Sequence, residues 1–403
     1  MNILFINDIP FNPRYGGIER VTDVLARELQ ARYGYNIYYL SFQIDSGQPY
    51  AYPAKMFVLP NPDDVNNSRH FVLEIVEKFK IDIIVNQRGQ FSYISDIIPS
   101  CGAKVVSVIH SQPSAWVKMT LLTLFNYRPQ TLAGIIKYII KVLLYPFVYY
   151  YSKRQMEKIY SRQYTEILNK YDALVLLSEK YKEELQELLH KDVSLYNIVG
   201  IPNPNTYQTP QWNFNKKDNI ILYVGRLDKT EKAPIRLLYL WKKIYKKFPN
   251  WKLILVGDGN YMKTMRQFVG DNVLERVYFE GQQTDLVPYY EKASFVCLTS
   301  NCEGWGMALT EGMQHGCVPF TFNSYGAATD IMQDMISGCL IKPYNLRQYQ
   351  ARLVHLMKND SLREEMSYQA YLKVQEFNAT RVVSRWNDLF IKLIGIPMSE
   401  ASL

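Results

Sequence analysis

The chain has 403 residues, and 48% of them are hydrophobic, which excludes a wholly disordered protein. The length exceeds what one hydrophobic core usually holds and suits two α/β domains of about 150–200 residues each. The formal net charge of +8 favours an anionic partner without identifying it.

The cysteine content argues against a disulfide framework. There are five cysteines, an odd number, and no Cys-x-x-Cys pair, so a reducing compartment fits better. The first ten residues lack the basic and long apolar regions of a signal peptide, and we expect a cytoplasmic protein. Cys297, Cys302 and His315 suggest a zinc site, but their spacing does not match structural zinc sites, so we expect no metal.

Apolar runs of strand length alternate with helical patterns along the first 200 residues. The predicted strands are residues 3–6, 37–42, 81–86, 105–109 and 173–177. A helical pattern follows the first strand at 18–32, and another follows the last at 179–189. Repeated β-α alternation predicts a parallel, doubly wound sheet.

A stretch rich in Pro, Asn and Thr at 201–215 predicts a linker. A second alternating series follows it, with predicted strands at 220–224, 252–256, 277–280, 295–298 and 318–320. We therefore expect two similar domains, at 1–200 and 216–378. A ligand would bind between them, at the carboxyl ends of the strands.

The segment 114–162 holds most of the net charge. Its basic residues are Lys118, Arg128, Lys137, Lys141, Lys153, Arg154, Lys158 and Arg162. With Glu157 as its one acidic residue, these eight cations give the segment +7. Lys137, Lys141 and Pro146 interrupt an apolar run that would need about 20 residues to span a membrane. The pattern favours an amphipathic segment lying on an anionic bilayer, and the alternative is an ordinary core helix.

Two glutamates flank a Gly-Trp-Gly turn in the stretch "EGWGMALTE", which runs from Glu303 to Glu311. Gly304 and Gly306 permit a tight turn, and the following residues predict a helix over 307–315. A helix start attracts hydroxyls or phosphates, and eight helical residues span about 12 Å. The carboxylates would then bind a sugar at one end and a ribose diol at the other, unless they are merely two solvated acids.

A second cluster lies in "LYVGRLDKTEKAP", where Arg226 and Lys232 follow the predicted strand 220–224. Two cations at the carboxyl end of a strand can hold a diphosphate and neutralise the charge that develops as it leaves. The alternative is a pair of surface cations. Gly16 and Gly17 follow the first strand, where backbone N–H groups can approach phosphate.

These elements, in this order, resemble the retaining glycosyltransferases of family 4, also described as glycosyl transferases group 1. The match runs through the glycine pair, "IPNP" at 201–204, "VGRL" with Lys232, "LVGDG" at 255–259 and the Glu-x7-Glu segment. The resemblance implies a GT-B fold, in which two Rossmann-like domains face each other across a deep cleft. It also implies that a helix within 379–403, over Ala379–Ile394, crosses back to the N-terminal domain.

The resemblance implies a role for each matched residue. Glu303 would contact the donor sugar and Glu311 the ribose, while Arg226 and Lys232 would grip the diphosphate. His110 would lie beside the reacting sugar carbon, although a hydrogen-bonded core histidine is an equal alternative. The other implied donor-binding residues are Gly16, Gly17, Gly281, Gln282, Trp305, Gly306, Met307 and Ala308.

The sequence also departs from the family pattern. The usual Phe is Trp305, the Gly after the lysine is Ala233, and the Ala after the second glutamate is Gly312. Asp330 stands where a glutamate is usual, and Glu19 and Arg20 follow the glycine pair toward the cleft. The charges are retained, whereas the shape around the sugar differs.

The implied reaction moves a sugar from a UDP or GDP donor to an acceptor hydroxyl with retention of configuration. No Asp-x-Asp motif is present, so we expect neither a metal nor another cofactor. The 114–162 segment favours a lipid-linked glycan acceptor in bacterial surface polysaccharide or lipopolysaccharide synthesis, at the inner face of the membrane, with no nucleic-acid partner. The alternatives are a sugar-nucleotide epimerase, a non-catalytic scaffold and, because "VGDG" lacks the third glycine, a disfavoured dinucleotide oxidoreductase.

Overall fold

The computed structural model describes residues 1–45, 50–89, 91–123, 131–214 and 217–395. Its N-terminal half is built on a seven-stranded parallel sheet of order β3-β2-β1-β4-β5-β6-β7. The strands are β1 Asn2–Asn7, β2 Asn36–Ser41, β3 Lys55–Val58, β4 Ile83–Asn86, β5 Lys104–Ile109, β6 Ala173–Leu176 and β7 Ile198–Gly200. The five predicted strands are confirmed, and the short strands β3 and β7 at the two edges were missed.

Helices cover both faces of this sheet because its strands are apolar on both sides. On one face, α1 (Gly17–Tyr33) buries Val21, Leu25 and Leu29 against the sheet. On the other face, α2 (Val65–Phe79) and α3 (Ser92–Ile97) close a second core. The helix α7 (Tyr181–Leu189) packs beside β7.

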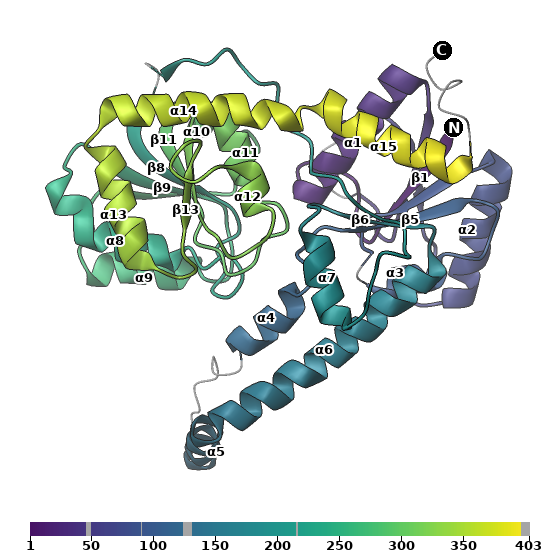
Figure 1. Cartoon of the computed structure of the whole chain (residues 1–403), viewed down its shortest axis with the longest axis horizontal. Helices are drawn as coiled ribbons and strands as arrows, with labels where there is room; N and C mark the ends of the chain where they lie inside the picture. Colours follow the sequence, from purple (N-terminus) through teal and green to yellow (C-terminus); the bar gives the residue numbers. More distant parts are fainter. Residues whose placement is uncertain (46–49, 90, 124–130, 215–216, 396–403) are drawn as a thin grey trace.

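The C-terminal half repeats this plan around a six-stranded parallel sheet of order β10-β9-β8-β11-β12-β13 (Figure 1). Its strands are β8 Asp218–Val224, β9 Lys252–Val256, β10 Val277–Gly281, β11 Ala293–Cys297, β12 Val318–Phe322 and β13 Cys339–Ile341. Its helices are α8 Ile235–Ile244, α9 Met262–Asp271, α10 Val287–Lys292, α11 Met307–Gln314, α12 Ala328–Ile331, α13 Leu346–Met357 and α14 Asp360–Val374. The chain is thus a GT-B-type pair of doubly wound domains, as the sequence predicted.

The last helix, α15 (Ala379–Ile394), leaves the C-terminal half and packs on α1 (Figure 1). Asn378 caps it, because its side chain accepts the N–H of Arg381 at 2.9 Å. Trp386 and Phe390 are buried in the N-terminal core beside residues of α1. The segment 201–214 returns in the opposite direction, and Asn205 is bonded to the carbonyl of Val374 at 2.9 Å. Two chain segments therefore tie the halves together.

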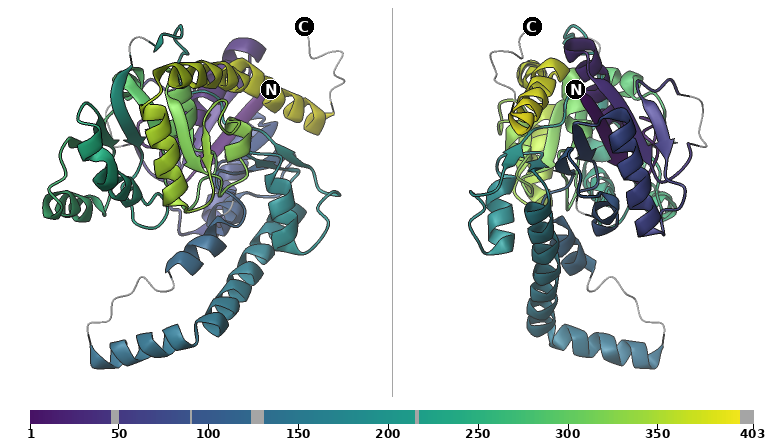
Figure 2. Two further views of the ribbon diagram at one scale, coloured as in Figure 1. Left: turned by 60° about the vertical axis from the view of Figure 1, so that its left-hand side comes forward. Right: turned by 90° about the vertical axis from the view of Figure 1, so that its right-hand side faces the viewer.

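The segment 114–162 forms an arm that projects from the body (Figures 1 and 2). It consists of α4 (Ala115–Thr123), α5 (Leu132–Leu143) and the first part of α6 (Tyr145–Lys170), while Arg128 lies outside the described residues. No residue of α5 is buried, so the alternative of a core helix is wrong for α5. Among the described residues, no single helix has the length and apolarity to cross a bilayer.

Replacing Phe390 tests how much α15 contributes to the fold. Phe390→Ala removes a fully buried ring, and we expect a loss of about 3–5 kcal/mol in the free energy of unfolding, measured by urea denaturation. Arg381→Ala, on the exposed first turn of the same helix, is the control and should cost less than about 1 kcal/mol. Equal costs for the two variants would contradict the packing of α15 on the N-terminal half.

Candidate active site

A cavity of about 590 Å³ lies between the two halves, at the carboxyl ends of strands from both sheets. Parallel strands direct all their carboxyl ends to one edge, and the two edges face each other here. The charged side chains that line the cavity are Glu19, Arg20, Arg88, Arg226, Glu231, Lys232, Glu303 and Glu311. The cavity therefore holds four cations and four carboxylates.

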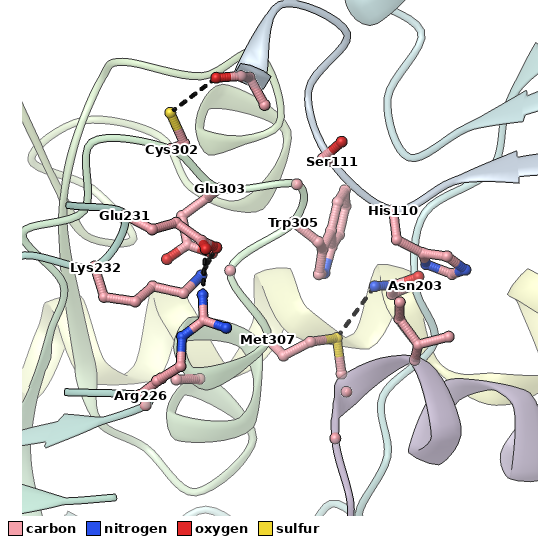
Figure 3. A pocket seen from close by; sticks show the side chains of 18 of the residues that line it. His110, Ser111, Asn203, Arg226, Glu231, Lys232, Cys302, Glu303, Trp305 and Met307 are labelled. Atoms are coloured by element: carbon pink, nitrogen blue, oxygen red, sulfur yellow. Dashed lines mark hydrogen bonds and ion pairs between the residues drawn. The ribbon is translucent and has the colours of Figure 1, made fainter. Parts of the chain in front are cut away.

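An ion pair between Lys232 and Glu303 forms one wall (Figure 3). The Lys232 Nζ lies 2.9 Å from Glu303 Oε2, and Ser300 donates its hydroxyl to Glu303 Oε1 at 2.7 Å. Burial alone would lower the pKa of Lys232, but the nearby carboxylates of Glu303 and Glu231 raise it by more. The pKa of Lys232 therefore lies above its ordinary value. Lys232 is therefore a fixed positive charge in the cavity wall.

The loop after β8 presents both predicted cations to the cavity. Asp228 Oδ1 accepts the backbone N–H groups of residues 230, 231 and 232, at 3.0, 2.6 and 3.2 Å, which fixes the loop. Arg226 is more exposed than Lys232, and it is bonded to Asp228 at 3.2 Å and to Glu231. Glu231 also lies 3.2 Å from Lys232, so one carboxylate bridges the two cations. Sequence analysis missed this bridge.

The turn before α11 brings the backbone of the C-terminal half against the N-terminal half. A Cβ on Gly304 would lie 1.9 Å from the carbonyl oxygen of His110, so only glycine fits. Gly306 has φ of 89°, a left-handed conformation that favours glycine, and it precedes the first residue of α11. Met307 and Ala308, in the first turn of α11, line the cavity, and the first N–H groups of a helix have no partner within the helix.

Trp305 belongs to the same turn and is 2% exposed. Its ring packs edge-on against Phe377, with the ring centres 4.9 Å apart. Its indole nitrogen is buried and has no hydrogen-bond partner in the described part of the chain. Trp305 lines the cavity, and a phenylalanine at this position would lack the N–H donor.

The second glutamate of the segment, Glu311, is only 1% exposed and has three partners. Its Oε1 lies 3.1 Å from the Arg20 guanidinium and accepts the Thr206 hydroxyl at 3.1 Å. Its Oε2 accepts the Tyr290 hydroxyl at 2.8 Å. The Glu311 charge raises the pKa of Arg20 above its ordinary value, so Arg20 stays positively charged. Arg20 belongs to α1, and the pair therefore joins the two halves.

The N-terminal half supplies the facing wall. Gly16 precedes α1, Gly17 begins it, and both line the cavity opposite α11, with Gly17 close to Met307. His110 follows β5, and its Nε2 lies 2.6 Å from Gln87 Oε1. That oxygen only accepts, so in this assignment Nε2 carries the hydrogen and Nδ1 is an acceptor with no partner among the described residues. Asn203 donates to the Met307 sulfur at 3.3 Å beside it (Figure 3).

Gly281, Gln282 and Asp330, which the resemblance to the family singled out, are not among the described residues that line this cavity. Gly281 ends the edge strand β10, and Gln282 follows it. Asp330 instead pairs with Lys180 of the N-terminal half at 2.7 Å. In the described ranges, no three His, Cys, Asp or Glu side chains form a group suited to a metal ion.

The sequence itself matches known families over most of its length. Residues 15–204 match the family described as Glycosyltransferase Family 4, and residues 205–373 match Glycosyl transferases group 1. Together with the two facing sheets, these matches show that the chain belongs to the family 4 glycosyltransferases of GT-B fold.

Curated relatives share part of the chain. An uncharacterized glycosyltransferase of Haemophilus influenzae is 28% identical over 54% of this chain and 61% of its own length. The poly(glycerol-phosphate) alpha-glucosyltransferase of Bacillus subtilis is 22% identical over 69% of this chain and 42% of its own length. The matched regions thus span roughly half the length of these relatives.

Solved structures show the same fold over nearly the whole chain. Sucrose-phosphate synthase from Thermosynechococcus elongatus has a TM-score of 0.74 and 16% identity, and the match covers 98% of this chain and 100% of that one. Anabaena HepE in complex with UDP and glucose has a TM-score of 0.70 and 15% identity, with 97% and 100% covered. At these identities the likeness concerns the fold alone.

The environment of His110 predicts a pH effect on stability. Burial, reinforced by the positive charge of Arg88, lowers the pKa of His110 from 6.5 to about 3. Between these values the unfolded chain binds the proton and the folded chain does not, so stability falls as the pH drops from 6.5 toward 3. We expect wild type to lose more stability than His110→Asn between pH 6.5 and pH 4 in urea denaturation. His70→Asn, on the exposed surface of α2, should follow wild type, and identical curves for all three proteins would refute the prediction.

Proposed function

We propose that this protein is a retaining glycosyltransferase that moves a sugar from a nucleoside diphosphate donor to the hydroxyl of a glycan or lipid-linked acceptor. Of the two candidate donor nucleotides, UDP and GDP, we propose UDP. The observation that carries the proposal is the gathering of Arg226, Lys232, Glu303 and the start of α11 around one cavity between the two halves. Such an arrangement suits an anionic leaving group attached to a polyhydroxylated sugar.

Each wall has a part in the proposed reaction. The bond between the sugar carbon and the diphosphate oxygen breaks while the acceptor oxygen forms its bond to the same carbon. Arg226 and Lys232 stabilise the negative charge that develops on the diphosphate, in a cavity where water is limited. The departing phosphate oxygen takes the acceptor's proton. Attack from the face that the leaving group vacates retains the configuration.

The remaining lining residues fit the sugar and ribose. Glu303 accepts hydrogen bonds from the donor sugar, and Nδ1 of His110 offers a second acceptor from the opposite wall. The N–H groups of Trp305, Gly306, Met307 and Ala308 donate to sugar hydroxyls or phosphate. Glu311 binds the ribose diol, which requires it to share or exchange its bond with Arg20. Gly16 and Gly17 close over the phosphates.

Relatives support an acceptor in cell-surface polymers. The matched Bacillus subtilis protein is a poly(glycerol-phosphate) alpha-glucosyltransferase. A Campylobacter jejuni relative, 25% identical over 45% of this chain, acts on a glycan linked to undecaprenol diphosphate. We extend this acceptor class to the present chain and place the reaction at the inner face of the cell membrane. The solved complex of HepE with UDP supports a UDP-linked donor. The absence of an Asp-x-Asp motif from the sequence supports transfer without a metal ion.

Two substitutions separate leaving-group stabilisation from donor binding. Arg226→Ala should lower kcat by about 100-fold, because it removes one charge that stabilises the departing diphosphate. Glu311→Ala should mainly weaken donor binding, by roughly tenfold or more, because it removes a charged acceptor. Glu311→Gln also removes the charge but keeps the side-chain volume and one acceptor oxygen, so it separates the loss of the charge from the cavity that alanine leaves.

Turnover of labelled UDP and GDP sugars, with and without EDTA and with acceptor, measures these effects. A thermal-shift screen of the same donors identifies the base first. Normal rates in both alanine variants would sink the site assignment. Conversion of the sugar without an acceptor would favour the epimerase, and neither donor binding nor slow hydrolysis would favour a non-catalytic scaffold.

Glu231 is predicted to compete with the donor. Its carboxylate bridges Arg226 and Lys232, where the proposed diphosphate would bind. Glu231→Gln should therefore tighten UDP binding several-fold, about 0.5–1 kcal/mol, in calorimetric titration. Glu275→Gln is the matched control, because Glu275 pairs with Arg276 at 2.8 Å before β10 and lies outside the cavity lining. Weaker UDP binding in Glu231→Gln would mean that Glu231 serves to hold the two cations in place.

A further inference from the structure

The outer end of the arm exposes an unusual concentration of apolar side chains. All residues of α5 are at least partly exposed, although the helix consists mostly of Ile, Leu and Val. The large apolar side chains exposed on α5 and at the start of α6 are Leu132, Ile135, Ile136, Ile139, Ile140, Val142, Leu143, Leu144, Tyr145, Phe147, Tyr150 and Tyr151. Such a patch on a soluble domain marks a surface that contacts something apolar.

The polar side chains of α5 occupy one side of the helix. Lys137 and Lys141 are four residues apart, so they lie on the same face, and the apolar residues cover the remainder. Farther along α6 follow Lys153, Arg154 and Lys158, with Glu157 paired to Lys153 at 3.6 Å. Basic charge therefore borders the apolar patch on the side that faces the body. An apolar patch bordered by basic side chains is the arrangement expected for a helix that inserts its apolar side into the headgroup region of an anionic bilayer.

The geometry of the arm gives α5 the orientation of an interfacial helix. The junction between α5 and α6 is bent by 85°, so α5 lies across the end of α6 (Figure 2). The far part of α6 is anchored in the body, because Tyr164, Ile167 and Leu168 are buried, and Tyr164 donates to the carbonyl of Pro113 at 3.2 Å. With 26 residues, α6 is about 39 Å long. The outer part of α6 is therefore a stalk that carries α5 at nearly a right angle.

The arm also adjoins the candidate active site. The helix α4 packs on α6, and its residues Trp116 and Met119 line the cavity. One turn beyond them, Leu122 is exposed on the way toward the arm. An apolar path thus leads from the cavity wall to the stalk.

We infer that α5 and the first two turns of α6 dock this protein onto an anionic phospholipid bilayer, with α5 lying in the headgroup region. The docked arm holds the cavity above the membrane at a distance set by α6, and α4 lies between α5 and the cavity. The link to a membrane-bound acceptor rests on the proposed function, whereas the docking surface stands on the charge, exposure and bend of the arm.

Vesicle flotation tests the docking surface directly. The full chain is mixed with phosphatidylcholine vesicles with and without about one-third phosphatidylglycerol, at low and high salt. We expect flotation with the anionic vesicles, weakened by salt, and at least about tenfold less flotation for the double variant Lys137→Gln/Lys141→Gln. Ile136→Asp and Ile140→Asp should also abolish it, because a carboxylate at these positions opposes burial in the bilayer.

Matched controls exclude effects of charge or apolarity alone. Lys246→Gln/Lys247→Gln removes the same charge from the far side of the C-terminal half, and Leu195→Asp places a carboxylate on another exposed apolar position. Both controls should float like wild type. Since α5 buries no residue, all arm variants should keep the wild-type unfolding temperature, which confirms that they fold.

Three outcomes would overturn the inference. One is the absence of flotation with anionic vesicles. Another is a vesicle-free dimer that Ile136→Asp dissociates, which would assign the patch to a second copy of the chain. The third is resistance to alkaline extraction, which would indicate that α5 and α6 together enter the bilayer core. Flotation with anionic vesicles, combined with no transfer from any nucleotide sugar, would support the docking surface and contradict the proposed function.

Discussion

A carboxylate taken out of water needs a positive partner close by, because leaving one unpaired costs several kcal/mol. Among the described residues, Arg20 is the cation paired with Glu311, and the two residues belong to different halves of the molecule. The pairing therefore sets how closely the halves approach, and at the same approach Gly304 meets the carbonyl of His110. These two contacts, together with the pair of Lys180 and Asp330, hold the halves facing each other across the cavity.

A second buried carboxylate of the cavity, that of Glu303, is neutralised within its own half. Glu303 is paired with Lys232, and both lie on loops at the carboxyl ends of neighbouring strands β8 and β11. Separation of the halves would leave this pair intact and break the pair of Glu311 with Arg20. The end of the cavity that carries Lys232, where we propose that the diphosphate binds, is thus formed on one sheet, whereas the Glu311 end is completed only where the halves meet.

Sequence patterns predicted the parts of the fold that depend on long apolar strands and one amphipathic helix face. They missed β3, β7 and β13, since short edge strands carry too few residues for a pattern. The order of the motifs predicted that Arg226, Lys232, Glu303 and Glu311 belong to the site. It did not predict that Glu231 bridges the two cations, because that contact depends on how Asp228 fixes the loop. Ala233, in place of the family's glycine, has φ of 45°, so the backbone keeps the glycine-like conformation that the sequence change conceals.

The arm also determines the electrostatics of the whole chain. Segment 114–162 carries +7 of the total +8, so the remainder is close to neutral at +1. A nearly neutral body attached to a strongly basic arm forms a large dipole, and an anionic surface would attract the arm end first. The screening length of about 8–10 Å at physiological salt is short compared with α6, so the body would feel little of that surface once α5 has docked. Orientation and catalysis would then depend on separate parts of the chain, with α6 setting the distance between them.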